Sequence, residues 1–599
     1  MSLRSGVTLR TGGAVIVDQL VRQGVPYAFG LCGHANIGLL DALYDARANV
    51  RTISVHHEQA AGHMADAYFR LTHEPCAIFA SSGPGSTNLP VALASAMMDS
   101  SALLAITGNV PSSHFNRGAF QETYRYFQAD FPSVLRPYVK RSFQPTRPEQ
   151  LPGVMRQAFR IMCDGRPGPV HVDVPLDLFV EKVECDDGDA PVPGPPVFRG
   201  GADPERVRAA VGMLLEARRP VLLVGGGVVL SEAEAQVQAL AERLGLPVVS
   251  TPLGAGVLTE DHPLHFGRVG RNGTYAANEA TRGADVLVAL GVRFDDRVSS
   301  GWIHGYTFSI PPTRLIQVDV DPDEIGRNYP VAIGLLGDVK TVVGQMQAEL
   351  GPGGIRPGSE AAWVGRLEEA RRVWQADRAP LREADGVPFH PERLITTLAA
   401  ALPEDAVVLS DVGVHHNWLV QSWPVRRHRS LLQSWGFGSM GFGVCGVLGA
   451  HLAVPDRTCV AVCGDGGMLM TPHAVATAVE YHIPAIWVVW NNGGYLSILD
   501  LQVAAFGPRE LGTRFLDGES GEPVRYDFAA IARAMGADGY RVERVGDLGD
   551  AIDSAVRSRR PSVIDVPVRG DVRPAGTGGW QLPPLAPFAP SYVPGAGAQ

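Results

Sequence analysis

Short apolar runs alternate along this chain with segments whose apolar residues recur every three or four positions. The first pattern is typical of strands buried on both faces, and the second of helices with one buried face. The clearest case runs from Cys459 to Ile498, CVAVCGDGGMLMTPHAVATAVEYHIPAIWVVWNNGGYLSI. It predicts a strand over 459–463, a helix over about 472–481 and a second strand over 485–490. Because the joints are short, we expect a βαβ unit with parallel strands.

Each of these two strands ends in a polar, glycine-rich cluster. The first cluster is Gly464-Asp465-Gly466-Gly467, and the second is Asn491-Asn492. Open α/β sheets bind ligands at the carboxyl ends of their strands. One carboxylate, one carboxamide and nearby carbonyls suit Mg²⁺, and glycines let a diphosphate approach the backbone. Gly-Asp-Gly alone is a common turn, so the prediction rests on the two clusters together.

The same alternation predicts three such units. Segments 12–24 and 37–46 are expected to be helices around a strand at 27–31, and a strand at 52–55 is followed by a helix near Glu58. The run PVLLVGGGVV opens a second unit, after a joint rich in Pro, Gly and Asp, and HPERLITTLAAAL opens a third. We therefore expect an α/β fold of three doubly wound parallel-sheet domains over 8–185, 195–350 and 388–570. The Pro/Gly-rich tail 571–599 is expected to be an arm over the active site or partly disordered.

Composition narrows the class of protein. The chain has 599 residues, 45% of them hydrophobic and 19% charged, with a net charge of −10 and seven cysteines. No basic stripe points to nucleic acid, and no signal peptide or apolar run long enough for a membrane span is seen. The cysteines form no CxxC pair, so we expect reduced, mostly buried thiols in a cytoplasmic protein.

Two motifs together resemble those of thiamine diphosphate (ThDP) enzymes. They are the Gly-Asp-Gly and Asn-Asn clusters and the segment His57-Glu58-Gln59 with Gly62-His63-Met64-Ala65. The resemblance implies that Asp465, the Asn492 side chain and the Gly494 carbonyl hold Mg²⁺, with Gly466 and Gly467 beside the diphosphate. It also implies that Glu58 hydrogen-bonds N1′ of the aminopyrimidine and so promotes loss of the thiazolium C2 proton. Taken alone, Glu58 is a first-turn glutamate favoured by the helix dipole.

Further ThDP contacts are implied around these motifs. The loop Ser82-Gly83-Pro84-Gly85 would approach the cofactor, with Asn88 just beyond it. In the segment QSWGFGSMG, the resemblance makes Met440 the apolar wedge that bends ThDP, and the Gly438 carbonyl the acceptor for its 4′-amino group.

Other segments resemble acetohydroxyacid synthase specifically. In that family, NRGAFQETYRYFQ and VKRSF imply that Phe120, Gln121 and Lys140 line the approach to C2 of the cofactor. The stretches GRVGRNGTYAANEA, LGVRFDDRVSSG and QVDVDPDEIGRN resemble its FAD-binding domain. By that resemblance Arg293, Asp295, Asp319 and Asp338 are candidate FAD contacts, and Gly225 and Gly226, in the glycine run that ends the first strand of this unit, are candidates for dinucleotide binding. The flavin performs no net redox in the synthases; alternatively, the domain keeps its fold without flavin.

Two regions depart from the synthase pattern. The loop Leu31-Cys32-Gly33-His34-Ala35-Asn36 resembles that of relatives that cleave cyclic diketones. It makes His34 a candidate oxyanion donor or acid/base, with Cys32 and Asn36 in the substrate pocket; an ordinary hydrogen-bonded loop histidine is the alternative. After the Asn-Asn cluster, Ser497 and Leu501 stand where the synthases have methionine and tryptophan. Together with Tyr495, they are expected to shape the substrate pocket.

Three functions are therefore compared. The first is a carboligase that transfers an acyl group from pyruvate or a 1,2-diketone to a carbonyl acceptor, which the RGAFQE and RFDDR stretches favour. The second is a C–C hydrolase of a cyclic or linear dione, which the His34 loop favours. The third, a non-catalytic ThDP/FAD-binding scaffold, is disfavoured because Glu58 and the metal ligands are present. The family's shared active sites imply a homodimer or homotetramer.

Overall fold

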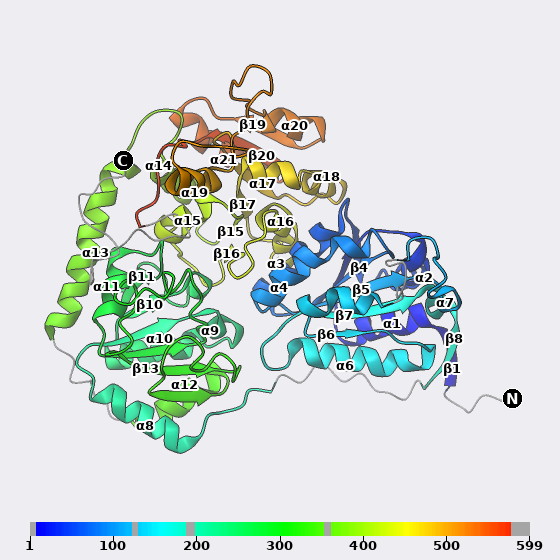
Figure 1. The fold of residues 1–599 in the computed structure, drawn as a ribbon, viewed down its shortest axis with the longest axis horizontal. Helices are drawn as coiled ribbons and strands as arrows, with labels where there is room; N and C mark the ends of the chain where they lie inside the picture. Colours follow the sequence, from blue (N-terminus) through cyan, green and yellow to red (C-terminus); the bar gives the residue numbers. More distant parts are fainter. Residues whose placement is uncertain (1–6, 123–129, 187–197, 353–360, 577–599) are drawn as a thin grey trace.

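The computed structural model describes residues 7–122, 130–186, 198–352 and 361–576. Three six-stranded sheets, parallel throughout, follow one another along the chain, as the alternating pattern predicted. In Figure 1 the first unit lies to the right in blue and cyan, the second at lower left in green, and the third above it in yellow and orange. Within the described residues no helix is both long and apolar enough to cross a bilayer.

The first sheet has the strand order β3-β2-β4-β5-β7-β6. Its strands are β2 (Tyr27–Gly30), β3 (Arg51–Ser54), β4 (Cys76–Ala80), β5 (Leu103–Asn109), β6 (Arg141–Phe143) and β7 (Val170–Pro175). Its helices are α1 (Gly12–Arg22), α2 (Ile37–Asp45), α3 (Glu58–Thr72), α4 (Pro90–Met98), α5 (Phe131–Leu135), α6 (Leu151–Cys163) and α7 (Leu176–Val180). A separate antiparallel ladder joins β1 (Val7–Thr11) to β8 (Lys182–Asp186) and brings the two ends of this unit together.

The second sheet has the order β11-β10-β9-β12-β13-β14. Its strands are β9 (Pro220–Val224), β10 (Val248–Ser250), β11 (His265–Arg268), β12 (Val286–Leu290), β13 (Arg314–Asp319) and β14 (Ile333–Leu336). Its helices are α8 (Pro204–Leu215), α9 (Gly226–Leu230), α10 (Glu234–Leu244), α11 (Tyr275–Gly283) and α12 (Val339–Glu349). The charged linker forms α13 (Ala361–Arg382), which runs along the outer side of this unit toward the third (Figure 1).

The third sheet has the order β16-β15-β17-β18-β20-β19. Its strands are β15 (Val407–Ser410), β16 (Leu431–Gln433), β17 (Cys459–Gly464), β18 (Ile486–Asn491), β19 (Asp538–Arg541) and β20 (Ser562–Pro567). Its helices are α14 (Pro391–Ala401), α15 (Val414–Ser422), α16 (Phe442–Ala453), α17 (Asp465–Met470), α18 (His473–Glu480), α19 (Leu496–Phe506), α20 (Phe528–Ala534) and α21 (Val545–Ser558). The predicted βαβ unit is therefore present, with α17 as an additional short helix.

Helices α3 and α16 pack against each other between the first and third sheets, inside one continuous apolar cluster. The two backbones approach closely at Gly449, where a Cβ atom would stand 2.0 Å from the Met64 carbonyl oxygen. At one end of this contact the Arg70 guanidinium binds the Asp66 and Asp99 carboxylates and donates to the Gln433 carbonyl. The contact thus places the helix that begins at Glu58 against the third unit.

Candidate active site

The carboxyl ends of β17 and β18 are tied together through the Asp465 carboxylate. Its Oδ2 accepts from the backbone N–H groups of Asn492, Gly493 and Gly494 at 3.0, 2.6 and 3.3 Å, and its Oδ1 accepts from Gly466 N–H at 2.8 Å. Burial raises the pKa of Asp465, and these four amides act in the opposite direction. Amide donors favour the ionised carboxylate, so the loop offsets part of the cost of placing a negative charge at the end of the sheet.

The side-chain oxygen of Asn492 shows that this edge suits a cation. Asn492 Oδ1 is buried and has no hydrogen-bond partner among the described residues. A buried carbonyl oxygen without a partner is costly unless something binds it. A hard cation held by Asn492 Oδ1, the neighbouring Asp465 carboxylate and the Gly494 carbonyl would satisfy it. The residues predicted as metal ligands therefore fit the metal.

A cavity of about 410 Å³ opens beside these residues. Most of the residues that line it belong to the third unit, and two segments of the second unit, 271–272 and 296–297, complete the lining. The predicted residues that line it are Gly438, Met440, Asp465, Gly466, Gly467, Asn492, Gly494, Tyr495, Ser497 and Leu501. Among the described residues, none from the first unit lines it.

Two lining features were missed by the sequence argument. His415, in the first turn of α15, is buried with its Nε2 unpartnered, and burial lowers its pKa to about 4. It fits an anionic ligand, such as a diphosphate, that would give this nitrogen a partner. The second feature is the pair Arg271 and Arg297 from the second unit. Arg297 and Arg271 belong to the stretches LGVRFDDRVSSG and GRVGRNGTYAANEA, but only tertiary packing places them in this cavity.

Glu58 lies on a different edge, at the carboxyl ends of the first sheet. It is the first residue of α3, is 5% exposed, and its Oε2 accepts from Asn88 Nδ2 at 2.9 Å. Among the described residues no second side chain is hydrogen-bonded to this carboxylate. Gly85 lies against its Oε1, since a Cβ there would stand 3.0 Å away. Glu58, Asn88 and the Gly83–Gly85 loop therefore form one group, as predicted.

Most of the predicted substrate residues of the first unit meet at this same edge, but the Asn36 side chain is bonded within its own loop and Lys140 lies elsewhere. The His34 and Phe120 rings are 5.9 Å apart, and Phe120 is 78% exposed. Gln121 has a left-handed backbone conformation, with φ 63°, and packs against Gly83. Gly83 has φ 59°, a conformation that glycine adopts more readily than other residues. Cys32 is exposed beside His34.

Asn36 and Lys140 are the exceptions. Asn36 is buried, and its side chain accepts from Gly33 N–H and donates to the Leu31 carbonyl at 3.0 Å each, so it shapes the loop. Lys140 precedes β6 and thus lies at the amino ends of the strands, at the opposite edge from Glu58. Its Nζ donates to the carbonyls of Asp164 and Arg166 at 2.6 and 2.8 Å.

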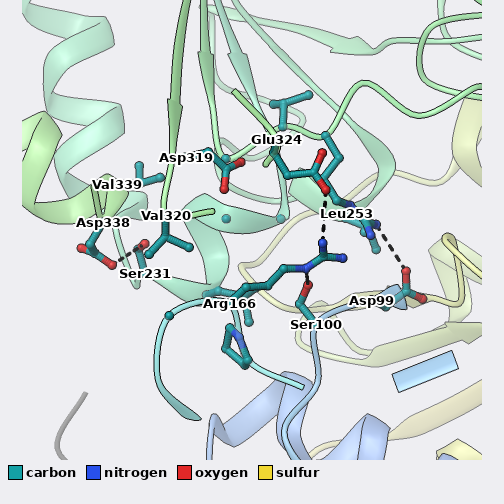
Figure 2. Close-up of a pocket in the computed structure, with 18 of the residues that line it drawn as sticks. Asp99, Ser100, Arg166, Ser231, Leu253, Asp319, Val320, Glu324, Asp338 and Val339 are labelled. Carbon is teal, nitrogen blue, oxygen red and sulfur yellow. Dashed lines mark hydrogen bonds and ion pairs between the residues drawn. The ribbon is translucent and has the colours of Figure 1, made fainter. Parts of the chain in front are cut away.

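A second cavity lies between the first and second units, closed on one side by Trp435 of the third. Of the predicted flavin contacts, Gly226, Arg293, Asp295, Asp319 and Asp338 line it. Gly225 instead packs behind the lining, where a Cβ would stand 2.1 Å from the Gly291 carbonyl oxygen. Figure 2 shows that Arg166, which sequence reasoning missed, enters this cavity from the first unit.

The charges of the second cavity suit a dinucleotide. Arg166 donates to Ser100 Oγ at 2.8 Å and pairs with Glu324 at 3.2 Å (Figure 2). Asp338 Oδ2 accepts from Ser231 Oγ at 2.8 Å, and burial raises the pKa of Asp319 to about 6. Carboxylates after strands can accept from ribose hydroxyls, and guanidinium groups suit phosphates. This residue set therefore fits FAD.

Comparison with known families agrees with this architecture. Three thiamine pyrophosphate enzyme models match the chain: the N-terminal TPP-binding domain over 10–129, the central domain over 207–346 and the C-terminal TPP-binding domain over 411–566. The chain thus has the three domains of a ThDP-dependent enzyme.

Curated relatives narrow the class. A probable acetolactate synthase large subunit of Methanocaldococcus jannaschii is 34% identical, covering 93% of this chain and 91% of the relative. Acetolactate synthase large subunits of Parasynechococcus marenigrum and Mycobacterium tuberculosis are 36% and 35% identical, over 93% and 94% of this chain and 88% and 89% of theirs. The chain belongs to the acetolactate synthase large-subunit family. It is a ThDP-dependent carboligase; the hydrolase alternative finds no support in these relatives.

Proposed function

We propose that this protein joins an acyl group from pyruvate, or from a 1,2-diketone, to the carbonyl carbon of a second small molecule. With pyruvate, the C1–C2 bond breaks, CO₂ leaves, and C2 bonds to the acceptor carbon while the acceptor oxygen takes up a proton. The similarity to acetolactate synthases supports a 2-oxo acid donor. The observation that carries the proposal is the buried, unpartnered Asn492 Oδ1 beside Asp465, in a cavity that Met440, Ser497 and Leu501 extend.

Asp465, Asn492 Oδ1 and the Gly494 carbonyl are proposed to hold Mg²⁺. Gly466 and Gly467, together with His415, are proposed to hold the cofactor's diphosphate. When bound, ThDP supplies the electron sink that stabilises the acyl carbanion. Met440 and the Gly438 carbonyl, which line the same cavity, would fix the conformation of the cofactor.

Glu58 is proposed to exchange a proton with the cofactor's aminopyrimidine through Oε1. Asn88 holds Oε2 and thereby orients the carboxyl group. His34 and Phe120, whose rings are adjacent, are proposed to face the acceptor with Gln121 and Cys32. A hydrogen bond from the His34 imidazole would stabilise negative charge on the acceptor oxygen. The backbone contacts of Asn36 and Lys140 favour structural roles for these two residues.

A second copy of the chain is proposed to complete each site. Within one chain, the described lining of the diphosphate cavity contains no residue of the first unit. Glu58 would then come from the partner of a homodimer or homotetramer. We propose 8–185, 195–350 and 388–570 as the functional domains. The tail 571–599 lies mostly outside the described residues; its first part reaches Asp500 of α19 through Arg573.

The second cavity is proposed to hold FAD without net redox. Asp319 and Asp338 would accept from ribose hydroxyls, and Arg166 and Arg293 would pair with the phosphates. The close glycine packing, in which a Cβ at Gly227 would stand 2.6 Å from Gly291 Cα, fits a dinucleotide lying near the backbone. We also propose a cytoplasmic location, which is consistent with the free state of the six cysteines described.

The test is product analysis with ThDP and Mg²⁺ present. Pyruvate alone should yield acetolactate and CO₂, and addition of a second carbonyl compound should yield the crossed product by mass spectrometry. Absence of any coupled product, with a ring-opened acid formed from cyclohexane-1,2-dione, would contradict the proposal.

A further inference from the structure

A small cavity of about 140 Å³ lies at the edge of the third sheet that is opposite to the candidate active site. Its lining includes Thr458, which directly precedes β17, and Ile486, the first residue of β18. These positions are the amino ends of the two strands whose carboxyl ends lead to Asp465 and Asn492. The cavity shares no lining residue with the two cavities described above.

Three basic side chains line this cavity. They are His451 near the end of α16, Arg457 in the loop that follows α16, and Arg559, which follows α21. The loop turns tightly, because Val454 N–H donates to the Ala450 carbonyl at 3.1 Å and Arg457 N–H donates to the Val454 carbonyl at 3.0 Å. The end of α16, its loop and the end of α21 thus bring three basic groups to one cavity.

Two nitrogen atoms of these basic groups are buried without an acceptor. Arg457 Nη2 and His451 Nδ1 are buried and have no hydrogen-bond partner among the described residues. His451 as a whole is 9% exposed, and Arg457 Nε donates to the Asp405 carbonyl at 2.6 Å, which fixes the guanidinium group. A basic residue at a helix end is favoured by the helix dipole, but the dipole does not compensate for buried nitrogens without partners. A ligand with several acceptor atoms would satisfy both.

The charge balance of the cavity favours an anion. Among the described residues, no carboxylate forms an ion pair with Arg457 or Arg559. The acidic residue in the lining is Asp456, which is exposed. Burial lowers the pKa of His451 and the charge of Arg559 acts in the same direction, while the Arg457 backbone and Asp456 oppose this change. Burial also lowers the pKa of Arg457. A bound anion would offset the cost of holding positive charge here.

The size of the cavity restricts the anion. Its volume is about one-third of the 410 Å³ of the diphosphate cavity, so it admits one compact group and not a whole coenzyme. A phosphate group carries about −1.5 to −2 charges at pH 7 and has at least three acceptor oxygens. These oxygens match two guanidinium groups and an imidazole, because arginine binds phosphate through paired N–H donors.

We propose that this cavity binds a phosphate group, which Arg457, Arg559 and the His451 imidazole hold. The phosphate is either inorganic phosphate or the end of a small phosphomonoester. Arg559 is exposed, so the organic part of such an ester would extend into solvent on its side. Because β17 runs from this cavity to Asp465, binding would stabilise the strand that leads to the proposed Mg²⁺ site. The inference does not depend on the proposed carboligase function.

The test is a calorimetric titration of inorganic phosphate into the protein saturated with ThDP, Mg²⁺ and FAD, at constant ionic strength set by chloride. Saturating ThDP keeps phosphate out of the diphosphate cavity. We expect one phosphate per chain with a Kd of about 1 mM or tighter. Arg457→Gln and Arg559→Gln should each raise Kd about 10- to 100-fold, because a charge-assisted hydrogen bond is lost. Arg557→Gln is the matched control, since this α21 side chain is 73% exposed, and it should bind like the wild type.

Glycerol 3-phosphate separates the two sources of the phosphate group. Tighter binding than that of inorganic phosphate would assign the site to a phosphomonoester, and weaker binding would assign it to inorganic phosphate; either result supports a phosphate site. No saturable binding of either compound would overturn the proposal. An Arg559→Gln protein that binds phosphate as well as Arg557→Gln would overturn it too, and this exposed position is substituted without disturbing the core.

Discussion

Glu58 and Asp465 lie at the carboxyl ends of strands in two domains with the same strand order, and their surroundings differ sharply. Each is a buried carboxylate at the first residue of a helix that follows a parallel strand. Asp465 accepts four backbone N–H groups, whereas Glu58 accepts one side-chain amide. Four amides favour the charged form of a carboxylate, while a single donor orients a carboxyl group and leaves its other oxygen without a hydrogen bond from a described side chain. This difference supports the proposal that one fold provides a metal anchor in one domain and an acid/base in the other.

The largest expected effect comes from removing the proton exchange at Glu58. Glu58→Gln keeps the size of the side chain and the contact with Asn88, and it loses the ionisable oxygen. We expect turnover to fall about 10²- to 10⁴-fold, the usual contribution of a positioned acid/base, with ThDP affinity nearly unchanged. Steady-state rates and equilibrium cofactor titration check this. Full turnover in the variant would refute the assigned role of Glu58.

A smaller effect is expected when the charge of Asp465 is removed. Asp465→Asn keeps an oxygen that can accept from the loop amides but lacks the negative charge. Mg²⁺ affinity, measured as the Mg²⁺ dependence of ThDP binding, should weaken about 10- to 100-fold. Turnover at saturating Mg²⁺ should recover in part. A variant with unchanged Mg²⁺ dependence would show that Asp465 is not a metal ligand.

A further prediction concerns stability rather than activity and involves Asp411, a third buried carboxyl, which lies next to Gly467. Its Oδ1 accepts from Gly441 and Gly443 N–H at 2.8 and 3.3 Å, its Oδ2 is buried without a partner, and burial raises its pKa to about 7. Because this folded-state pKa lies above the ordinary value, stability is lost as pH rises from about 4 through 7. Without cofactors, Asp411→Asn should raise the free energy of unfolding at pH 8 by about 2–4 kcal/mol.

Urea unfolding at pH 4 and pH 8 checks the Asp411 prediction. The difference between wild type and variant should shrink to below about 1 kcal/mol at pH 4, where the carboxyl group is protonated in the folded protein and nearly half protonated in the unfolded protein. An equal difference at both pH values would mean that packing, not ionisation, is responsible.

Much of the fold could be predicted, because strands buried on both faces and amphipathic helices leave distinct patterns. The strands predicted at 459–463 and 485–490 are β17 and β18, and the helix predicted at about 472–481 is α18. The short helix α17 was missed because Asp-Gly-Gly is a poor helix former. Its start is supported by tertiary hydrogen bonds from the Asn492 loop to Asp465, which local propensity does not record.

The candidate site was predictable where a residue follows directly from a strand end, as for Glu58, Asp465 and Asn492. It was less predictable where the position depends on how distant segments pack. Lys140 was placed near the cofactor by resemblance, yet the start of β6 puts it at the other edge of the sheet. Arg166 and Arg271 enter their cavities from neighbouring domains or loops, and no local pattern marks them.

The central claim is that Glu58 and Asp465 act on one cofactor from two different chains. Mixing Glu58→Gln and Asp465→Ala proteins under conditions of subunit exchange tests it, since a mixed dimer contains one site with both native residues. Half of the dimers would be mixed, each with one intact site of two, so activity should rise to about a quarter of the wild-type value. Activity that stays at the level of the separate variants would contradict a shared site.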